Sequence, residues 1–345
     1  MKYCILGKSG LRVSQICLGT MTFGEEFGWG NSRQESRKVF DYFLDMGGNF
    51  IDTANHYTKG TSEKLLGEFI EHKRNQIVLA TKYTLNTSPK DPNAGGNHRK
   101  NMVRSLEDSL KRLQTDYIDL FYLHIWDETT PIEEILRAFD DLVKSGKILH
   151  VGLSDTPAWI IAKGDTLASF RGYSPIVAMQ LEYSLIERSI EREYFDMSKS
   201  LDIPIVAWSP LGMGVLSGKY NERKGNQTKE ARFQVNPTWG ESYLKEKNMQ
   251  IAKKVVKIAK DAARSPTQVA LNWILQKSPL MIPIIGAKTQ SQLEENLGCL
   301  DFVLTSQQMK ELDEVSHFDL GFPYNFIHKK NILDSIFGDN EILDF

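Results

Sequence analysis

Four residues with acid–base side chains each follow shortly after an apolar segment of the sequence: Asp52, Tyr57, Lys82 and His124. A carboxylate, a phenol, an ammonium and an imidazole presented together form a set suited to proton transfer onto a polarised carbonyl oxygen. The alternative is an ordinary buried Asp52–Lys82 ion pair with no chemical role.

Each of the four residues has a distinct part in such chemistry. A carbonyl oxygen that gains negative charge needs a donor in contact with it, and Tyr57 is the candidate acid. An unperturbed phenol titrates at about 10, and a nearby ammonium such as Lys82 is expected to lower that value. Asp52 would hold Lys82 in place and keep it charged, while His124 would donate a hydrogen bond to the carbonyl oxygen.

The elements that must position these side chains alternate between strand and helix. Short apolar runs, typical of parallel strands covered on both faces, lie at 16–18, 49–52, 77–80, 118–123, 148–153, 176–179, 203–207 and 281–285. Helices are expected near 32–46, 61–70, 99–113, 132–144, 157–168, 190–200, 242–263, 266–277 and 290–299. Eight such units predict a closed (β/α)8 TIM barrel. A doubly wound open sheet is the competing fold, but no GxGxxG motif follows the first strand.

The remaining segments fit a single domain spanning 1–345. Residues 3–7 and 12–14 flank a turn and predict an N-terminal β-hairpin that plugs one end of the barrel. A charged tract lies around 221–232, and a C-terminal tail from Phe318 to Phe345 repeats aromatic residues. These aromatics would either pack on the barrel wall or line a substrate pocket.

Composition restricts the partners of the chain. Its 345 residues carry a net charge of −2 with acids and bases interspersed, which argues against binding to nucleic acid or to a membrane surface. No apolar stretch reaches the roughly 18 residues of a spanning helix. The three cysteines lie far apart and show no metal-binding spacing, so we expect a cytoplasmic protein without a metal. The oligomeric state cannot be predicted.

Seven polar or aromatic positions lie at or just beyond the predicted strand ends. In a parallel barrel such positions ring one mouth, at the carboxyl ends of the strands. They are Asp52, Lys82, His124, Ser154, Gln180, Trp208 and Lys288.

In combination these motifs resemble the aldo-keto reductase superfamily over nearly the whole chain. The resemblance rests on the run Asn49–Tyr57, Thr81–Lys82, Asp119–Leu120 with His124, Gly152–Ser154, Gln180, Ser209–Gly212 and Gln292–Asn296. The loops are more similar to the bacterial aldo/keto reductase, aryl-alcohol dehydrogenase and potassium-channel β-subunit branches. The family resemblance implies a (β/α)8 barrel, a nicotinamide cofactor, usually NADPH, and reduction of an aldehyde or ketone with Tyr57 as the acid.

The resemblance also implies a cofactor site. Ser154 and Gln180 would bind the carboxamide and Trp208 would stack on the nicotinamide, with Asp155 standing where the family usually has Asn. Lys288 favours NADPH, whereas Gln292 replaces a common Arg, so NADH remains possible. The full set comprises Gly19, Thr20, Met21, Asp52, Ser154, Asp155, Gln180, Trp208, Ser209, Pro210, Leu211, Gly212, Gly214, Leu216, Ser217, Lys219, Gly286, Lys288, Gln292, Glu295 and Asn296. An ordinary flexible loop is the alternative for the Gly-rich segment 212–218.

The substrate would be a small carbonyl compound. Its expected apolar pocket consists of Phe23, Trp29, Tyr57, His124 and Trp126.

Three other functions remain open. The first is an NADPH-binding regulatory subunit with little turnover, and the second is an aldolase that uses Lys82 as a Schiff-base nucleophile. Asp52 argues against the aldolase because it keeps the amine protonated. The third, a metal-dependent hydrolase, lacks a His-x-His pair and enough clustered carboxylates.

Overall fold

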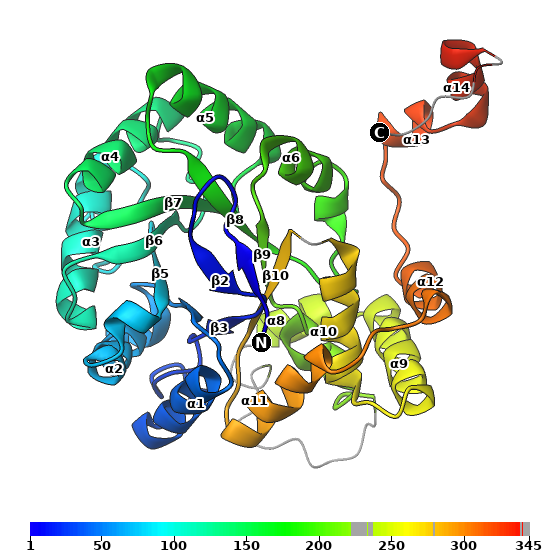
Figure 1. The fold of residues 1–345 in the computed structure, drawn as a ribbon, viewed down its shortest axis with the longest axis horizontal. Coiled ribbons are helices and arrows are strands. Elements are labelled where there is room, and N and C mark those ends of the chain that lie inside the picture. The colour runs from blue at the N-terminus through cyan, green and yellow to red at the C-terminus, as the bar shows by residue number, and fades with distance from the viewer. Residues whose placement is uncertain (222–232, 234–236, 279, 339, 341–345) are drawn as a thin grey trace.

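Eight parallel strands close into a barrel in the computed structural model of the chain (Figure 1). The structure describes residues 1–221, 233, 237–278, 280–338 and 340. In ring order the strands are β3 (Cys17–Gly19), β4 (Phe50–Asp52), β5 (Val78–Tyr83), β6 (Ile118–Leu123), β7 (Ile148–Ser154), β8 (Ile176–Glu182), β9 (Ile205–Trp208) and β10 (Met281–Ile285). β10 pairs with β3 and completes the ring. The predicted (β/α)8 barrel is confirmed.

Helices surround the strands as an outer ring (Figure 1). They are α1 (Arg33–Asp45), α2 (Thr61–Ile70), α3 (Arg99–Leu113), α4 (Ile132–Lys144), α5 (Ala158–Arg171), α6 (Tyr194–Leu201), α10 (Pro266–Lys277) and α11 (Gln290–Leu297). The connection from β9 to α10 also contains α8 (Pro237–Tyr243) and α9 (Glu246–Asp261). Local sequence sets the helix ends: Ser265 and Gln268 form a reciprocal capping box that starts α10 directly after α9.

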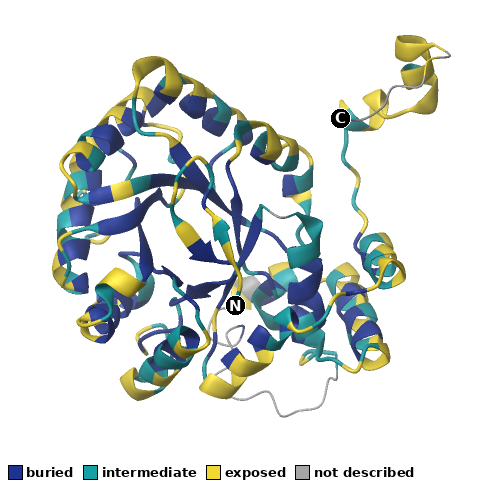
Figure 2. Cartoon of the chain, in the orientation of Figure 1, coloured by how far each residue is buried: buried dark blue, intermediate teal, exposed yellow. Residues whose placement is uncertain are grey.

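The apolar core has two layers, one between the strands and the helices and one inside the barrel. In Figure 2 the strands and the inward faces of the helices are buried. The inner layer includes Phe50, Val78, Leu120, Val206 and Ile282 from five different strands. Because alternate residues of each strand point to opposite faces, both layers need apolar side chains, which explains the continuous apolar runs in the sequence.

The N-terminal hairpin closes one end of the barrel, as predicted. Its antiparallel strands are β1 (Tyr3–Ile5) and β2 (Arg12–Ser14). Leu6 and Val13 are fully buried and belong to the same apolar cluster as the inner layer of the barrel. The hairpin therefore keeps water out of the end of the barrel opposite to the site described below.

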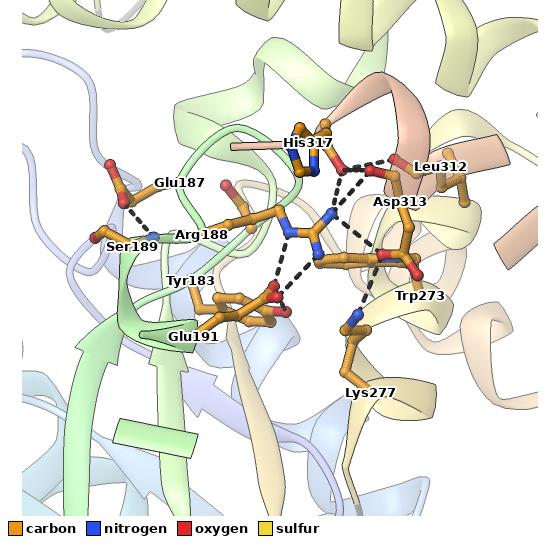
Figure 3. Close-up of polar contacts among 12 residues, drawn as sticks. Tyr183, Glu187, Arg188, Ser189, Glu191, Trp273, Lys277, Leu312, Asp313 and His317 are labelled. Carbon is orange, nitrogen blue, oxygen red and sulfur yellow. Dashed lines mark hydrogen bonds and ion pairs between the residues drawn. The ribbon is translucent and has the colours of Figure 1, made fainter. Parts of the chain in front are cut away.

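A half-buried arginine joins the loop after β8 to α10 and α12 (Ser306–Val315) (Figure 3). Arg188 binds Glu191 through Nε and Nη2, at 2.7 and 2.9 Å. Its Nη1 donates to Ser316 Oγ at 2.7 Å and lies 3.2 Å from Asp313 Oδ1, which also pairs with Lys277 at 3.1 Å. This network ties the segment after β8 to two helices from the end of the chain.

The C-terminal tail lies away from the barrel. Its short helices α13 (Tyr324–Ile327) and α14 (Lys330–Phe337) project beyond α12 (Figure 1) and are largely exposed (Figure 2). Phe322 is 85% exposed and Ile336 is 61% exposed. The described part of the tail therefore does not line the mouth of the barrel.

Several predicted boundaries differ from the structure. The expected helix at 190–200 is a 3-10 turn, Ser189–Glu191, followed by α6, and the expected helix at 242–263 begins only at Glu246. Gly164 does not interrupt α5, and the strand expected at 203–207 lies at 205–208. The charged tract around 221–232 lies, apart from Asn221, outside the described residues.

Within the described ranges, no helix is both long and apolar enough to cross a lipid bilayer.

Candidate active site

The carboxyl ends of the strands form one mouth of the barrel, and the predicted strand-end residues meet there. Asp52 ends β4, Lys82 lies near the end of β5 and His124 directly follows β6. Ser154 and Trp208 end β7 and β9. Parallel pairing fixes this arrangement, because Asp52 lies beside Ala80 on β5 and Ser154 lies beside Gln180 on β8.

Asp52 and Lys82 form a fully buried ion pair at the centre of the mouth. Lys82 Nζ lies 2.5 Å from Asp52 Oδ2 and donates to the carbonyl oxygen of Thr53 at 2.7 Å. Burial by itself would lower the pKa of Lys82, but the charge of Asp52 and the hydrogen bonds to Asp52 and Tyr57 outweigh it and raise the pKa. Lys82 is therefore a permanent cation at neutral pH, which disfavours a role as a Schiff-base nucleophile.

Tyr57 presents its hydroxyl to this cation. Lys82 Nζ donates to the Tyr57 oxygen at 3.2 Å. Tyr57 begins a tight turn in which Thr58 and Lys59 adopt left-handed backbone angles, with φ of 46° and 55°. This turn leads directly into α2 and returns the phenol to the mouth of the barrel.

The protonation state of Tyr57 differs from the expectation based on sequence. Burial raises the pKa of Tyr57 above its ordinary value, and the nearby Lys82 cation offsets only part of this increase. The expectation that Lys82 would bring the pKa of the phenol below about 10 is wrong for the net shift. At neutral pH Tyr57 is therefore a protonated donor.

His124 lies against Tyr57 and is uncharged at neutral pH. The two rings meet edge to face with centroids 6.0 Å apart. Burial, with smaller contributions from Lys82 and His56, holds the pKa of His124 well below its usual range. Its Nδ1 atom is buried, and no described residue hydrogen-bonds to it. A neutral imidazole can donate one hydrogen bond without adding charge beside Lys82.

Side chains in the first turn of α2 hydrogen-bond to the strand ends from outside the barrel. Ser62 Oγ lies 2.8 Å from Thr20 Oγ1 and 3.0 Å from Thr53 Oγ1. The fully buried Glu63 accepts from Thr81 Oγ1 at 2.6 Å and pairs with Arg112 at 2.6 Å. The sequence predicts the start of this helix, but nothing in it indicates that Ser62 and Glu63 contact three strand ends.

The carboxamide-binding residues expected from the sequence lie together at the ends of β7 and β8. Gln180 Nε2 donates to Asp52 Oδ1 at 2.8 Å, which fixes the amide plane. Ser154 Oγ is buried and has no hydrogen-bond partner among the described residues. An unpartnered buried hydroxyl beside an oriented amide fits a carboxamide ligand, because buried polar atoms normally have partners.

Asp155 and Trp208 are joined at the same rim. The indole Nε1 of Trp208 donates to Asp155 Oδ1 at 3.0 Å. Trp208 is half-buried, so the indole ring borders the mouth while its N–H is held by the carboxylate. The ring position is compatible with stacking on a nicotinamide.

The Gly-rich segment after β9 forms a tight turn with unusual backbone angles. It is a 3-10 turn, Gly212–Ser217, in which Met213 and Gly214 have φ of 53° and 91°. Ser209 Oγ accepts from the backbone N–H of Met213 at 3.0 Å. Leu216 is fully buried in the core, so only its backbone can face a ligand. The other predicted members of this segment are Pro210, Leu211, Ser217 and Lys219.

The adenosine segment predicted after β10 is also compact. The backbone N–H of Lys288 donates to Gln292 Oε1 at 2.8 Å, and Asn296 Nδ2 donates to the carbonyl oxygen of Gly286 at 3.5 Å. Glu295 is exposed on α11. At the end of β3, Gly19 lies beside Asp52 at the mouth and Met21 follows as a half-buried turn residue, while the hydroxyl of Thr20 is bound to Asp52 O and Ser62.

The predicted aromatic pocket is only partly assembled as expected. Phe23 is fully buried, and its ring lies edge to face against Phe69 of α2, inside the core. Trp126 is half-buried and packs against the outer core cluster. Trp29 instead contacts Phe27 at 5.8 Å, and Phe27 lies 6.3 Å from the ring of His56. Phe27 and His56 are not among the residues predicted from the sequence, although both lie close to predicted site residues.

Comparison with known proteins agrees with this geometry. Residues 15–317 match the sequence profile of the Aldo/keto reductase family. The chain is 37% identical to norsolorinic acid reductase of Aspergillus flavus, over 92% of this chain and 82% of that protein. It is 36% identical to an aryl-alcohol dehydrogenase [NADP(+)] of Phanerodontia chrysosporium, over 93% of this chain and 89% of that protein. A putative aryl-alcohol dehydrogenase of Saccharomyces cerevisiae is 33% identical over 94% of this chain and 89% of that protein.

A closed eight-stranded barrel, an acid–base set at the carboxyl ends of its strands and a profile match over most of the chain lead to one conclusion: the chain belongs to the aldo/keto reductase family and is an NAD(P)H-dependent oxidoreductase.

Proposed function

We propose that this protein reduces aromatic aldehydes or ketones to alcohols with NADPH, and that Tyr57 donates the proton. The observation that carries the proposal is the contact of 3.2 Å between the Tyr57 hydroxyl and the ammonium of the buried Lys82. This contact lies at the mouth of the barrel, beside the unpartnered Ser154 hydroxyl and the oriented Gln180 amide.

The side chains divide the chemistry between them. When bound, reduced nicotinamide supplies the hydride that adds to the carbonyl carbon and leaves negative charge on the oxygen. Tyr57 is protonated at neutral pH and gives its proton to that oxygen. Lys82 then stabilises the phenolate left on Tyr57, and Asp52 keeps Lys82 in contact. His124 donates a hydrogen bond that orients the carbonyl group.

Aromatic side chains support a flat aromatic substrate. Trp29, Phe27 and His56 form a continuous row of rings that continues along the chain to Tyr57. Trp29 is buried, whereas Phe27 and His56 are half-buried and offer ring faces for stacking beside the proton donor. The name of one relative, aryl-alcohol dehydrogenase [NADP(+)], agrees with an aromatic substrate and with NADPH.

Lys288 is the residue that we assign to the NADPH preference. It follows β10 and is half-buried, with its backbone bound to Gln292. An ammonium at this point can pair with a 2′-phosphate, which NADH lacks. Because Gln292 adds no charge, the preference for NADPH over NADH is expected to be moderate.

The test has two steps. The wild-type protein is first titrated with NADPH and NADH by fluorescence, and a panel of aromatic and aliphatic carbonyl compounds is then followed by loss of reduced cofactor. Tyr57→Phe should keep the affinity for NADPH while kcat falls by roughly 100-fold or more. Tyr117→Phe, which removes an exposed hydroxyl bound to Asn75, serves as the control and should leave kcat unchanged.

Unchanged turnover in Tyr57→Phe would remove Tyr57 from the mechanism. Tight binding of NADPH without reduction of any compound in the panel would contradict the reductase and favour a regulatory protein that only binds the cofactor.

A further inference from the structure

Asp155 has a strained backbone at the rim of the mouth. It directly follows Ser154 at the end of β7 and adopts a left-handed φ of 39°, a region that Asp tolerates better than most residues. Its backbone N–H donates to the backbone carbonyl oxygen of Gln180 at 3.1 Å. Its own backbone carbonyl oxygen accepts from the backbone N–H of Trp126 at 3.3 Å. The residue is thus fixed between the strand ends that we assign to the carboxamide.

Among the described residues, hydrogen bonds reach only one of the two oxygens of the Asp155 carboxylate. Oδ1 accepts the indole N–H of Trp208 at 3.0 Å. Among the residues that the structure describes, none hydrogen-bonds to Oδ2. The carboxylate therefore keeps one oxygen free at the edge of the ring that we expect to stack on the nicotinamide.

The charge of this carboxylate changes within the physiological range. Burial raises the pKa of Asp155 to about 6, although Trp208 and Lys82 oppose the rise. The other ionisable groups whose charges act on Asp155 or respond to it are Glu182 on β8, Tyr57 and Tyr194. Both tyrosines have raised pKa values and stay neutral, and Lys82 stays cationic.

We propose that Asp155 sets the preference of the site between the two redox states of the cofactor, its carboxylate stabilising the oxidised form. This inference rests on the proposed function, because it assumes that nicotinamide binds between Ser154, Gln180 and Trp208. The oxidised ring carries a positive charge and the reduced ring is neutral. A fixed anion at the rim therefore attracts the first and not the second. An asparagine at this position would carry no such charge.

The proposal predicts a dependence on pH. Below the pKa of Asp155 its carboxyl group is neutral and adds no electrostatic attraction to the binding of either redox state of the cofactor. Above that pKa the carboxylate is ionised and the oxidised cofactor binds more tightly relative to the reduced one. If binding of the oxidised cofactor lowers the pKa of Asp155 by about one unit, the ratio of Kd(NADP+) to Kd(NADPH) falls about fivefold from about pH 5 to about pH 7.5.

The ratio removes a competing effect. The 2′-phosphate titrates in the same range, but both redox states carry it, so its contribution cancels in the ratio. Glu182 is the other carboxyl group that could cause such a pH dependence, because its pKa is raised to about 7 and it lies beside Trp208 in the sheet. Its Oε1 atom accepts from the hydroxyl of Tyr243 at 2.5 Å.

The experiment measures both dissociation constants across this pH range by stopped-flow fluorescence, before reduced cofactor decomposes in acid. Wild type, Asp155→Asn and the matched control Glu182→Gln are compared. We expect the ratio to fall with rising pH in wild type and in Glu182→Gln. In Asp155→Asn it should stay flat, near the low-pH value of wild type.

Three results would overturn the proposal. They are a flat ratio in wild type, an unchanged slope in Asp155→Asn, and loss of the slope in Glu182→Gln instead. Each of these leaves the reductase intact, because both cofactors still bind. Failure of either redox state to bind wild type would instead contradict the proposed function, and the inference with it. If Asp155→Asn does not fold, the comparison of wild type with Glu182→Gln still decides between the two carboxylates.

Discussion

Lys82 Nζ donates a hydrogen bond of 3.2 Å to the hydroxyl of Tyr57 while it remains paired with a buried carboxylate. The ammonium is thus held at the phenol by groups that do not take part in proton transfer themselves. Lys82 is fully buried and Tyr57 is half-buried, so little water screens the charge of Lys82 from the phenol, and this contact is the first target for mutation.

Lys82→Met should abolish turnover and weaken the fold. Without Lys82 the carboxylate of Asp52 is buried and unpaired, and breaking a buried pair in this way costs about 3–5 kcal/mol. The double variant Lys82→Met with Asp52→Asn should recover much of the free energy of unfolding but none of the activity. Urea unfolding and kcat measure the two effects. Recovery of turnover in the double variant would show that the cation is dispensable.

His124 should make stability depend on pH. Its pKa is far below that of a free imidazole, so the unfolded chain takes up a proton first as the pH drops below about 6.5. Stability is therefore present above this value and is lost as the pH falls toward the folded pKa. His124→Gln removes this contribution, so its free energy of unfolding should fall less than that of wild type between about pH 7 and pH 5. Parallel curves for the two proteins would contradict the low pKa.

Glu63 should support catalysis without touching the substrate. Glu63→Ala removes the bond to Thr81, the residue next to Lys82, and leaves Arg112 unpaired. We expect a loss of about 2–4 kcal/mol in the free energy of unfolding, together with a lower kcat and a nearly unchanged KM. Thr81→Val keeps the Glu63–Arg112 pair and separates the two effects. A large change in KM would place Glu63 closer to the substrate than the structure does.

Lys288→Met should weaken NADPH binding about tenfold and leave NADH binding unchanged, because only NADPH carries the 2′-phosphate. Lys253→Met on α9 removes an exposed lysine from another helix and is the control. Titrations with both cofactors measure the effect. Equal losses for NADPH and NADH would assign Lys288 to another part of the cofactor.

Phe27→Ala should distinguish aromatic from aliphatic substrates. Phe27 lies between Trp29 and His56, so its removal opens the row of rings. KM for an aromatic aldehyde should rise about tenfold, in line with the loss of one stacking partner, whereas KM for a short aliphatic aldehyde should change little. Equal effects on both substrates would place Phe27 in a structural role.

The barrel and its central residues could be predicted from the sequence because they follow from local patterns. Buried strand runs fix the strand ends, and strand ends fix where Asp52, Lys82 and His124 lie. The support from Ser62 and Glu63 could not be predicted, because hydroxyl and carboxyl groups near a helix start usually act as caps. The burial of Phe23 in the core could not be predicted, because sequence spacing does not reveal whether a loop aromatic turns toward the mouth or into the core. The net pKa of Tyr57 depends on the depth of burial, which only the packed structure reveals.

Closure of the ring also bears on how the chain folds during synthesis. β10 meets β3 through Ile284 beside Cys17 and Ile285 beside Leu18, so the last strand of the barrel pairs with the first. Until the ribosome has released residues beyond 285, β3 and the growing end of the sheet expose unpaired backbone groups that can capture other chains. The finished ring has no free edge of this kind. The nascent polypeptide is therefore more prone to aggregation than the mature barrel.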